Sequence, residues 1–258
     1  MYRSTALIAA VSSASWLLTH AFVGDKLFLR LMPLAARSRA EEKKKTDDTF
    51  RRLLAINATA FTHACIVTAL GLSVALKPDV RGDPFNGEST RFDVANAIMI
   101  GYFIWDVLIC LKEYRTFGLT FIAHATISLT ACVANAMASQ TKMVLLVSMF
   151  VGTEISTPAL HIRWLLLQLD MASTRWFKLA NFIFIALFIG YRLVLVPVYA
   201  VAPFFRDCLA PHADRETVGM GIERRVCYVT MILFWLALNY YWAFLMLKSQ
   251  FKTRVKRE

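Results

Sequence analysis

The sequence predicts an all-α membrane protein that crosses the bilayer as a bundle of about seven helices, and its composition is the first observation that points there. Hydrophobic residues make up 57% of the 258 residues, the mean hydropathy is +0.51 and charged residues reach 18%. A soluble domain usually carries about 25% charged residues. The apolar residues also gather in stretches of about 20 residues, the length that a helix needs to span a bilayer. Soluble and disordered chains are both excluded, because neither keeps so much apolar surface out of water.

Seven stretches reach this length, and each must be a helix, because an isolated strand in lipid leaves its backbone polar groups without hydrogen bonds. The predicted spans are residues 5–23, 53–76, 94–112, 117–138, 142–160, 177–204 and 226–247. The fifth span contains Glu154 and Pro158, so we expect a kink or a partly re-entrant path there.

The first span is better explained as a retained helix than as a cleaved signal peptide. Arg3 gives only a weak basic start, the segment 26–52 is far more basic, and no convincing small-x-small cleavage pattern precedes it. We therefore expect an additional N-terminal helix (1–24), a basic cytoplasmic loop (25–52), a six-helix membrane domain (53–247) and a basic cytoplasmic tail (248–258).

Lys and Arg are distributed unevenly between the two sides of the predicted bundle. With the N-terminus outside, the cytoplasmic segments carry 19 Lys and Arg residues and the opposite side carries 9. Basic residues favour the cytoplasmic side, so this split predicts a lumenal N-terminus and a cytoplasmic C-terminus. The rule also accounts for the net charge of +11 without a nucleic-acid partner, since no nucleic-acid-binding motif is present. Segment 37–52 is either a solvated loop or surface helix, or a site for lipid headgroups.

Polar residues recur at helical spacing within most of the spans. The faces are Thr120, His124, Ser128, Ala131 and Asn135 in the fourth span; Thr59 and His63 in the second; Tyr102, Asp106, Ile109 and Glu113 in the third; Glu154, Thr157 and His161 in the fifth; Asn181, Phe188, Arg192 and Tyr199 in the sixth; and Tyr228, Trp235, Asn239 and Trp242 in the seventh. Two explanations fit these faces. They are either interhelical hydrogen bonds, worth about 0.6 kcal/mol each, or the lining of a cavity.

Charged residues at membrane depth favour the cavity, although pairing offers a structural alternative. A charge at the helix centre costs roughly 2.5–3.5 kcal/mol, more than one interhelical hydrogen bond returns. Pairing of Arg192 with Asp106 or Glu154 would neutralise two charges at once. The predicted cavity lining is Thr120, Ser128, Asn135, Thr157, Arg163, Asn181 and Arg192.

His124 is the candidate catalytic residue, with Glu154 or Asp106 as the carboxylate that orients it. Imidazole can shuttle protons or accept an acyl group, although a single intramembrane His is commonly structural. The five His residues show no pair at ligand spacing, so we expect no metal site, and no motif indicates a cofactor. The five Cys residues form no CxxC; Cys208 and Cys227 flank a hydrophilic loop, where a disulfide is one alternative.

Three motifs follow one another along the chain. They are Gly101-Tyr-Phe-Ile-Trp-Asp106 with Lys112-Glu-Tyr, then Phe121-Ile-Ala-His-Ala-Thr-Ile-Ser-Leu, then Glu154-Ile-Ser-Thr-Pro158 with Arg163-Trp164, Asn181 and Tyr191-Arg192. Together they resemble the TLC-domain family, which includes the ceramide synthases and the TRAM translocon proteins. The third motif is more similar to the small TLC-domain transmembrane proteins than to true ceramide synthases. The resemblance covers residues 50–245.

The resemblance implies a six-helix barrel-like bundle in the endoplasmic reticulum that encloses a lipid-sized cavity. In ceramide synthases the corresponding region carries two adjacent His residues and a following acidic pair, and it transfers an acyl chain from acyl-CoA to a sphingoid base. This sequence has only His124, flanked by Ala123 and Ala125, and Glu154 stands where the acidic pair would be. These departures argue against ceramide synthesis and leave lipid binding intact.

Two functional hypotheses follow. The first is an integral membrane protein of the endoplasmic reticulum that acts in lipid homeostasis, sphingolipids included. It binds a membrane lipid or fatty acyl chain, with Arg192, Glu154, Asp106 and His124 near the polar end. The second is a ceramide-synthase-like acyltransferase that uses acyl-CoA, with His124 as base or acyl carrier. A seven-span receptor shares the topology, but NPxxY and DRY motifs are absent from the corresponding positions.

Overall fold

The computed structural model describes residues 2–82, 89–137, 143–209 and 222–255, and within these ranges the chain forms helices and no strand. Seven helices in that part of the chain are long and apolar enough to cross a membrane: Thr5–Phe22, Asp48–Ala75, Thr90–Lys112, Tyr114–Ala136, Val144–Gln168, Arg175–Arg206 and Arg225–Lys248. Each overlaps one predicted span. The predicted fold class, an all-α multi-pass bundle, is confirmed.

The first span continues as a helical run beyond its apolar part. α1 (Tyr2–Leu18) passes through the π-helical segment η1 (Thr19–Val23) into α2 (Gly24–Arg30). α3 (Leu34–Thr46) follows and packs against α2 and α4 (Asp48–Ala75). The predicted basic loop is therefore largely a folded helix.

Side-chain caps set the starts of the next spans. Asp47 accepts a hydrogen bond from the Phe50 amide at 2.8 Å and begins α4. After the short α5 (Pro78–Gly82), Ser89 caps α6 (Thr90–Lys112) through the Phe92 amide at 3.3 Å. Such caps satisfy amides that have no partner in the first turn. The helices consequently begin several residues before the apolar stretches from which the spans were predicted.

The fourth and fifth spans are both interrupted. α7 (Tyr114–Ala136) contains Gly118, whose φ of 72° and ψ of −178° are not helical. The fifth span consists of α8 (Val144–Val151), the 3₁₀ turn η2 (Gly152–Ser156) and α9 (Thr157–Gln168). Where a kink or a partly re-entrant path was expected, around Glu154 and Pro158, the α-helix thus changes to a 3₁₀ turn.

π-Helical turns occupy much of the sixth span. It consists of α10 (Arg175–Leu187), η3 (Phe188–Leu195), η4 (Pro197–Val201) and α11 (Ala202–Leu209), and α12 (Ile222–Val255) completes the chain. A π-helix closes i→i+5 hydrogen bonds and so changes which side chains share a face. Arg192 is 6% exposed and Tyr199 is 62% exposed. The prediction that both share one face is therefore wrong.

α4 lies at the centre of the packing, against α6, α8, η2 and α9, while α1 packs along α6. Gly101 on α6 permits this close approach, because a Cβ at its position would overlap Ser12 of α1. Ser12 Oγ donates a hydrogen bond to the Ile98 carbonyl at 3.1 Å. The N-terminal helix is therefore in direct contact with the rest of the bundle.

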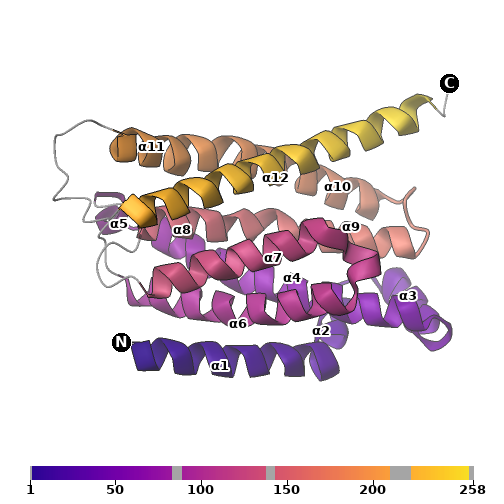
Figure 1. Cartoon of the computed structure of the whole chain (residues 1–258). Coiled ribbons are helices and arrows are strands. Elements are labelled where there is room, and N and C mark those ends of the chain that lie inside the picture. Colours follow the sequence, from indigo (N-terminus) through magenta and orange to yellow (C-terminus); the bar gives the residue numbers. More distant parts are fainter. Residues whose placement is uncertain (1, 83–88, 138–142, 210–221, 256–258) are drawn as a thin grey trace.

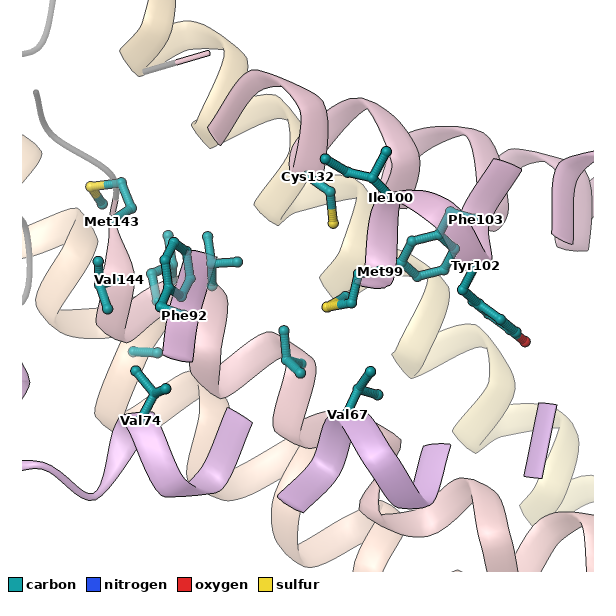
Figure 2. Packing of buried hydrophobic residues seen from close by; sticks show 14 of the residues in the cluster. Val67, Val74, Phe92, Met99, Ile100, Tyr102, Phe103, Cys132, Met143 and Val144 are labelled. Carbon is teal, nitrogen blue, oxygen red and sulfur yellow. The ribbon is translucent and has the colours of Figure 1, made fainter. Parts of the chain in front are cut away.

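Buried apolar side chains form two clusters. The larger joins most of the spans, and Figure 2 shows part of it, with labelled side chains from α4, α6, α7 and the start of α8. The smaller lies between α2, α3, α4 and α9 and contains Phe28, Phe50 and Leu165. It fixes α3 against the ends of two spans.

One end of the bundle gathers the basic residues of α3. Figure 1 shows α3, the junction of α6 with α7, and the C-terminal end of α12 together at the right, with the N-terminus at the left. Arg39 Nη1 and Lys43 Nζ donate to the carbonyls of Leu169 and Gln168, at 3.3 and 2.7 Å. Cations thus cap the C-terminus of α9, where free carbonyls favour positive charge. We call this end of the bundle the basic end.

Candidate functional site

Arg192 in η3 is a buried cation bonded to three other elements. Its Nε donates to the Thr153 carbonyl at 2.9 Å, Nη1 to Asn239 Oδ1 at 3.4 Å, and Nη2 to Thr157 Oγ1 at 3.3 Å. Nη2 also lies 3.6 Å from Glu154 Oε1. We call Thr153, Glu154, Thr157, Arg192 and Asn239 the charged node.

The local backbone explains why these groups meet. Gly152 begins η2, and a Cβ there would overlap the hydroxyl of Tyr191, the neighbour of Arg192. The absence of a side chain therefore lets η3 approach η2 closely. On α12, Asn239 Nδ2 donates to the Trp235 carbonyl at 2.8 Å, which leaves its Oδ1 free to accept from Arg192.

The charged node satisfies its buried ion pair with several further hydrogen bonds. Burial of an ion costs several kcal/mol unless geometry and additional bonds compensate it. One of the two predicted pairings is present, with Glu154 as the acid. Because all three guanidinium nitrogens are directed at protein acceptors, Arg192 is bound to the protein itself.

Asp106 on α6 lies near this node but outside its hydrogen bonds. It interacts electrostatically with Glu154, and its Oδ1 accepts the Cys110 thiol at 3.7 Å. Its side chain is half-buried. Among the described residues, the Asp106 carboxylate therefore accepts a hydrogen bond only from the Cys110 thiol, which is a weak donor.

His124 on α7 also lies within electrostatic range of Glu154 and Arg192. Its ring is edge-on to Trp242, with 5.5 Å between centroids, and to Phe103, at 6.2 Å. Within the described ranges, neither candidate carboxylate hydrogen-bonds to the imidazole. The residue predicted to be catalytic is thus close to the charged node and held by aromatic contacts.

The other residues of the predicted lining differ in their surroundings. Thr120 and Ser128 are half-buried on α7, four residues on either side of His124. Asn135 is buried and accepts a hydrogen bond from the Tyr228 hydroxyl at 3.1 Å. Asn135 therefore links α7 to α12 in the manner of an interhelical hydrogen bond.

Arg163 and Asn181 form a separate polar contact between α9 and α10. Arg163 Nε donates to Asn181 Oδ1 at 2.8 Å, and the guanidinium lies 5.8 Å from the Phe177 ring centroid. Two residues predicted to line the cavity thus bond to each other.

Sequence reasoning left two members of the charged node unassigned. Asn239 belonged to a predicted polar face of the last span, and its burial at 1% exposure distinguishes it. Thr153 contributes a backbone carbonyl, which carries no signal in the sequence.

A second buried group consists of rings from α1, η1, α4 and α6. His63 stacks on Tyr102 at 3.4 Å between centroids, Trp16 is edge-on to both rings, and His20 lies 5.6 Å from Trp105. Ring nitrogens of Trp16, His20, His63 and Trp105 are buried without a hydrogen-bond partner among the described residues. We call these five residues the ring cluster.

The sequence also raised the questions of a metal site and of a disulfide between Cys208 and Cys227. Among the described residues, no group of three or more His, Cys, Asp or Glu side chains is arranged to hold a metal ion. Cys227 is a free thiol, while the side chain of Cys208 lies outside the described residues.

The chain is similar to known proteins over most of its length. The family model described as TLC domain matches residues 54–248. A TLC domain-containing protein 4 C from Dictyostelium discoideum is 23% identical over 233 residues, which are 90% of this chain and 80% of that protein. Topoisomerase I damage affected protein 4 from Saccharomyces cerevisiae is 27% identical over 92 residues, 34% of this chain and 32% of that protein. No solved structure matches.

Proposed function

Because this chain belongs to the TLC-domain family, whose members are membrane proteins linked to lipid metabolism, we propose that it binds a lipid or fatty acyl chain inside its bundle and acts in lipid homeostasis. The observation that carries the proposal is the charged node, with Asp106 and His124 beside it. Such costly groups are rare inside membranes and usually mark ligand or ion pathways.

Partial exposure of these groups supports an internal binding space. Asp106, His124 and Thr157 are half-buried, and the Glu154 side chain keeps 16% of its accessible surface. Their neighbours Tyr102 and Phe103 are buried. Polar side chains that are surrounded by helices and still accessible are the expected lining of a pocket with a few convergent polar groups.

The bonding of Arg192 suggests how the ligand is oriented. Its guanidinium is engaged by protein acceptors, so the polar end of the ligand would meet Asp106 and His124 instead. The hydrocarbon chain would lie along the apolar sides of α6, α7 and α12. This arrangement differs from the predicted one, in which Arg192 itself faced the ligand.

Lipid extraction tests this proposal. We expect purified wild-type protein to retain one lipid class above its share in the bulk membrane, and Asp106→Leu to change the amount or identity of that lipid. Arg175→Met, an exposed position at the start of α10, is the control and should retain the wild-type lipid. Retention of bulk lipid alone, measured by mass spectrometry of extracts, would contradict the proposal.

An acyltransferase that uses acyl-CoA is the second candidate, because His124 lies within electrostatic range of Glu154 and is only half-buried. In this case His124 acts as base or acyl carrier. Membranes containing wild-type protein or His124→Ala would be incubated with labelled acyl-CoA and lipid acceptors. Wild-type product that is lost in the variant supports the enzyme, whereas equal product from both rejects it.

We further propose that the protein resides in the endoplasmic reticulum with its N-terminus lumenal and its C-terminus cytoplasmic. The 19 to 9 distribution of Lys and Arg supports this orientation. Glycosylation sites introduced separately at 77–93 and 24–52 test it. Glycosylation at 24–52 alone would show that the orientation is the reverse of the one proposed. Absence of endoplasmic-reticulum glycans at both sites would argue against the proposed location.

A further inference from the structure

We infer that the ligand's hydrocarbon chain reaches the charged node between α7 and α12 at the basic end, through a seam covered by Phe121 and Trp242; this inference rests on the proposed lipid binding. The seam consists of Phe121, His124 and Trp242. The rings of Phe121 and Trp242 lie 6.0 Å apart, and Trp242 covers His124 from the α12 side. Phe121 is 44% exposed, so the cover borders the surface of the bundle.

The two halves of α12 are attached differently to the bundle. Toward its start, the Tyr228 hydroxyl bonds to Asn135, and Trp235 stacks on Phe150 at 4.7 Å. Asn239 then accepts from Arg192. Beyond this point the ring of Trp242 contacts the rings of Phe121 and His124 on α7. These ring contacts can separate without breaking a hydrogen bond, so we place the entry of the hydrocarbon chain here.

α7 provides a hinge next to the seam. Gly118 has a φ of 72° and a ψ of −178°, in a region of backbone conformation that only glycine adopts readily. A Cβ at this position would meet nothing within 4 Å. The first turn of α7 is therefore joined to the rest by a non-helical residue in open surroundings, three residues before Phe121.

The seam leads to the polar groups of the site. Trp242 contacts His124 and lies three residues after Asn239, which accepts a hydrogen bond from Arg192 of the charged node at 3.4 Å. On its outer side, α12 exposes Phe244 and Leu245, a surface suited to hydrocarbon. An aliphatic chain that slides between the two helices thus meets aromatic rings first and the polar end of the site last.

Cross-linking the seam tests this route. In a variant with the native Cys residues replaced, Phe121→Cys and Trp242→Cys would be joined by a short bifunctional thiol reagent. The control joins Phe50→Cys to Trp164→Cys, a ring pair between α4 and α9 away from the seam, where the native rings lie 6.1 Å apart. The measurement is the rate at which a deuterated phosphatidylcholine with 16-carbon chains replaces retained lipid, followed by mass spectrometry.

We expect the seam cross-link to slow replacement by about tenfold or more, as for other gated sites, and the control cross-link to leave it unchanged. Trp242→Ala should accelerate replacement, while Trp176→Ala, an exposed Trp on α10, should not. Equal rates with and without the seam cross-link would overturn the seam while leaving lipid binding standing. Absence of any retained lipid before cross-linking would overturn both.

Discussion

The charged node and the ring cluster are both polar groups buried among apolar helices, and they are stabilised in different ways. In the charged node, each nitrogen of Arg192 has an acceptor. In the ring cluster, both nitrogens of His63 are buried without a hydrogen-bond partner among the described residues, and the contacts are between ring faces and edges.

The difference follows from charge. A buried ion without partners costs several kcal/mol, so Arg192 can be buried only when its nitrogens have acceptors. A neutral ring nitrogen costs about 1–3 kcal/mol when it is unpaired, and close packing of large rings can offset that cost. Hydrogen bonds thus stabilise the charged node, and ring packing stabilises the ring cluster. Replacing a polar side chain with an apolar one of similar size should therefore lower the free energy of unfolding in the node and raise it in the ring cluster.

Arg192→Met should have the largest effect, because it leaves the half-buried carboxylate of Glu154 beside an uncharged side chain. We expect a loss of about 3–5 kcal/mol in the free energy of unfolding. The double variant Arg192→Met with Glu154→Leu should recover most of this loss, since it removes both charges. Unfolding in detergent micelles measures both variants, and equal losses in the two would show that the ion pair is not what stabilises the node.

Gly101→Ala should weaken the ring cluster by moving α1 away from α6. The new Cβ overlaps Ser12, and overpacking of this kind costs about 1–3 kcal/mol. Gly190→Ala is the matched control, because a Cβ there meets nothing within 4 Å. Thermal melting should separate the two variants; indistinguishable melting temperatures would contradict the tight contact between α1 and α6.

His63→Phe should stabilise the protein, by about 1 kcal/mol, because it removes two unpaired nitrogens and keeps a ring against Tyr102. The sign is opposite to that expected for Arg192. His124→Phe is the control and should bring no such gain, since the His124 ring is only half-buried. A clear loss of stability in His63→Phe would contradict this prediction, because it would show that the His63 nitrogens contribute a stabilising hydrogen bond.

Ser12→Ala should have the smallest effect. It removes one interhelical hydrogen bond, to the Ile98 carbonyl, and such bonds are worth about 0.6 kcal/mol. Ser15→Ala removes a bond within α1, to the Val11 carbonyl, and should change the contact between helices even less. The comparison by thermal melting indicates how much of the α1 attachment depends on polar contacts.

Hydropathy was sufficient to predict the number and order of the spans, because the bilayer fixes the length of an apolar helix. It did not predict where the helices begin, since capping residues such as Asp47 and Ser89 lie outside the apolar stretches. The pairing of Arg192 was predicted as one of two alternatives. Spacing within a helix defines a face but not the partner that faces it, so Glu154 could not be preferred over Asp106 from the sequence.

The sixth span shows a second limit. Its polar face was predicted from α-helical spacing, and the π-helical turns of η3 and η4 change that spacing beyond Arg192. Tyr199 consequently points outward. Likewise, the Thr153 carbonyl belongs to the charged node because η2 is a 3₁₀ turn, and backbone geometry of that kind has no residue-type signature.

The position of Trp16 shows that the packed bundle extends beyond the segment that the family model matches. The TLC domain match begins at residue 54, yet Trp16 of α1 covers both His63 and Tyr102, which lie inside it. A fragment that begins at residue 54 would lack Trp16 and would expose the rings of His63 and Tyr102 to lipid. Experiments on this protein should therefore retain its first helix, since the shorter fragment would present a different surface to the bilayer.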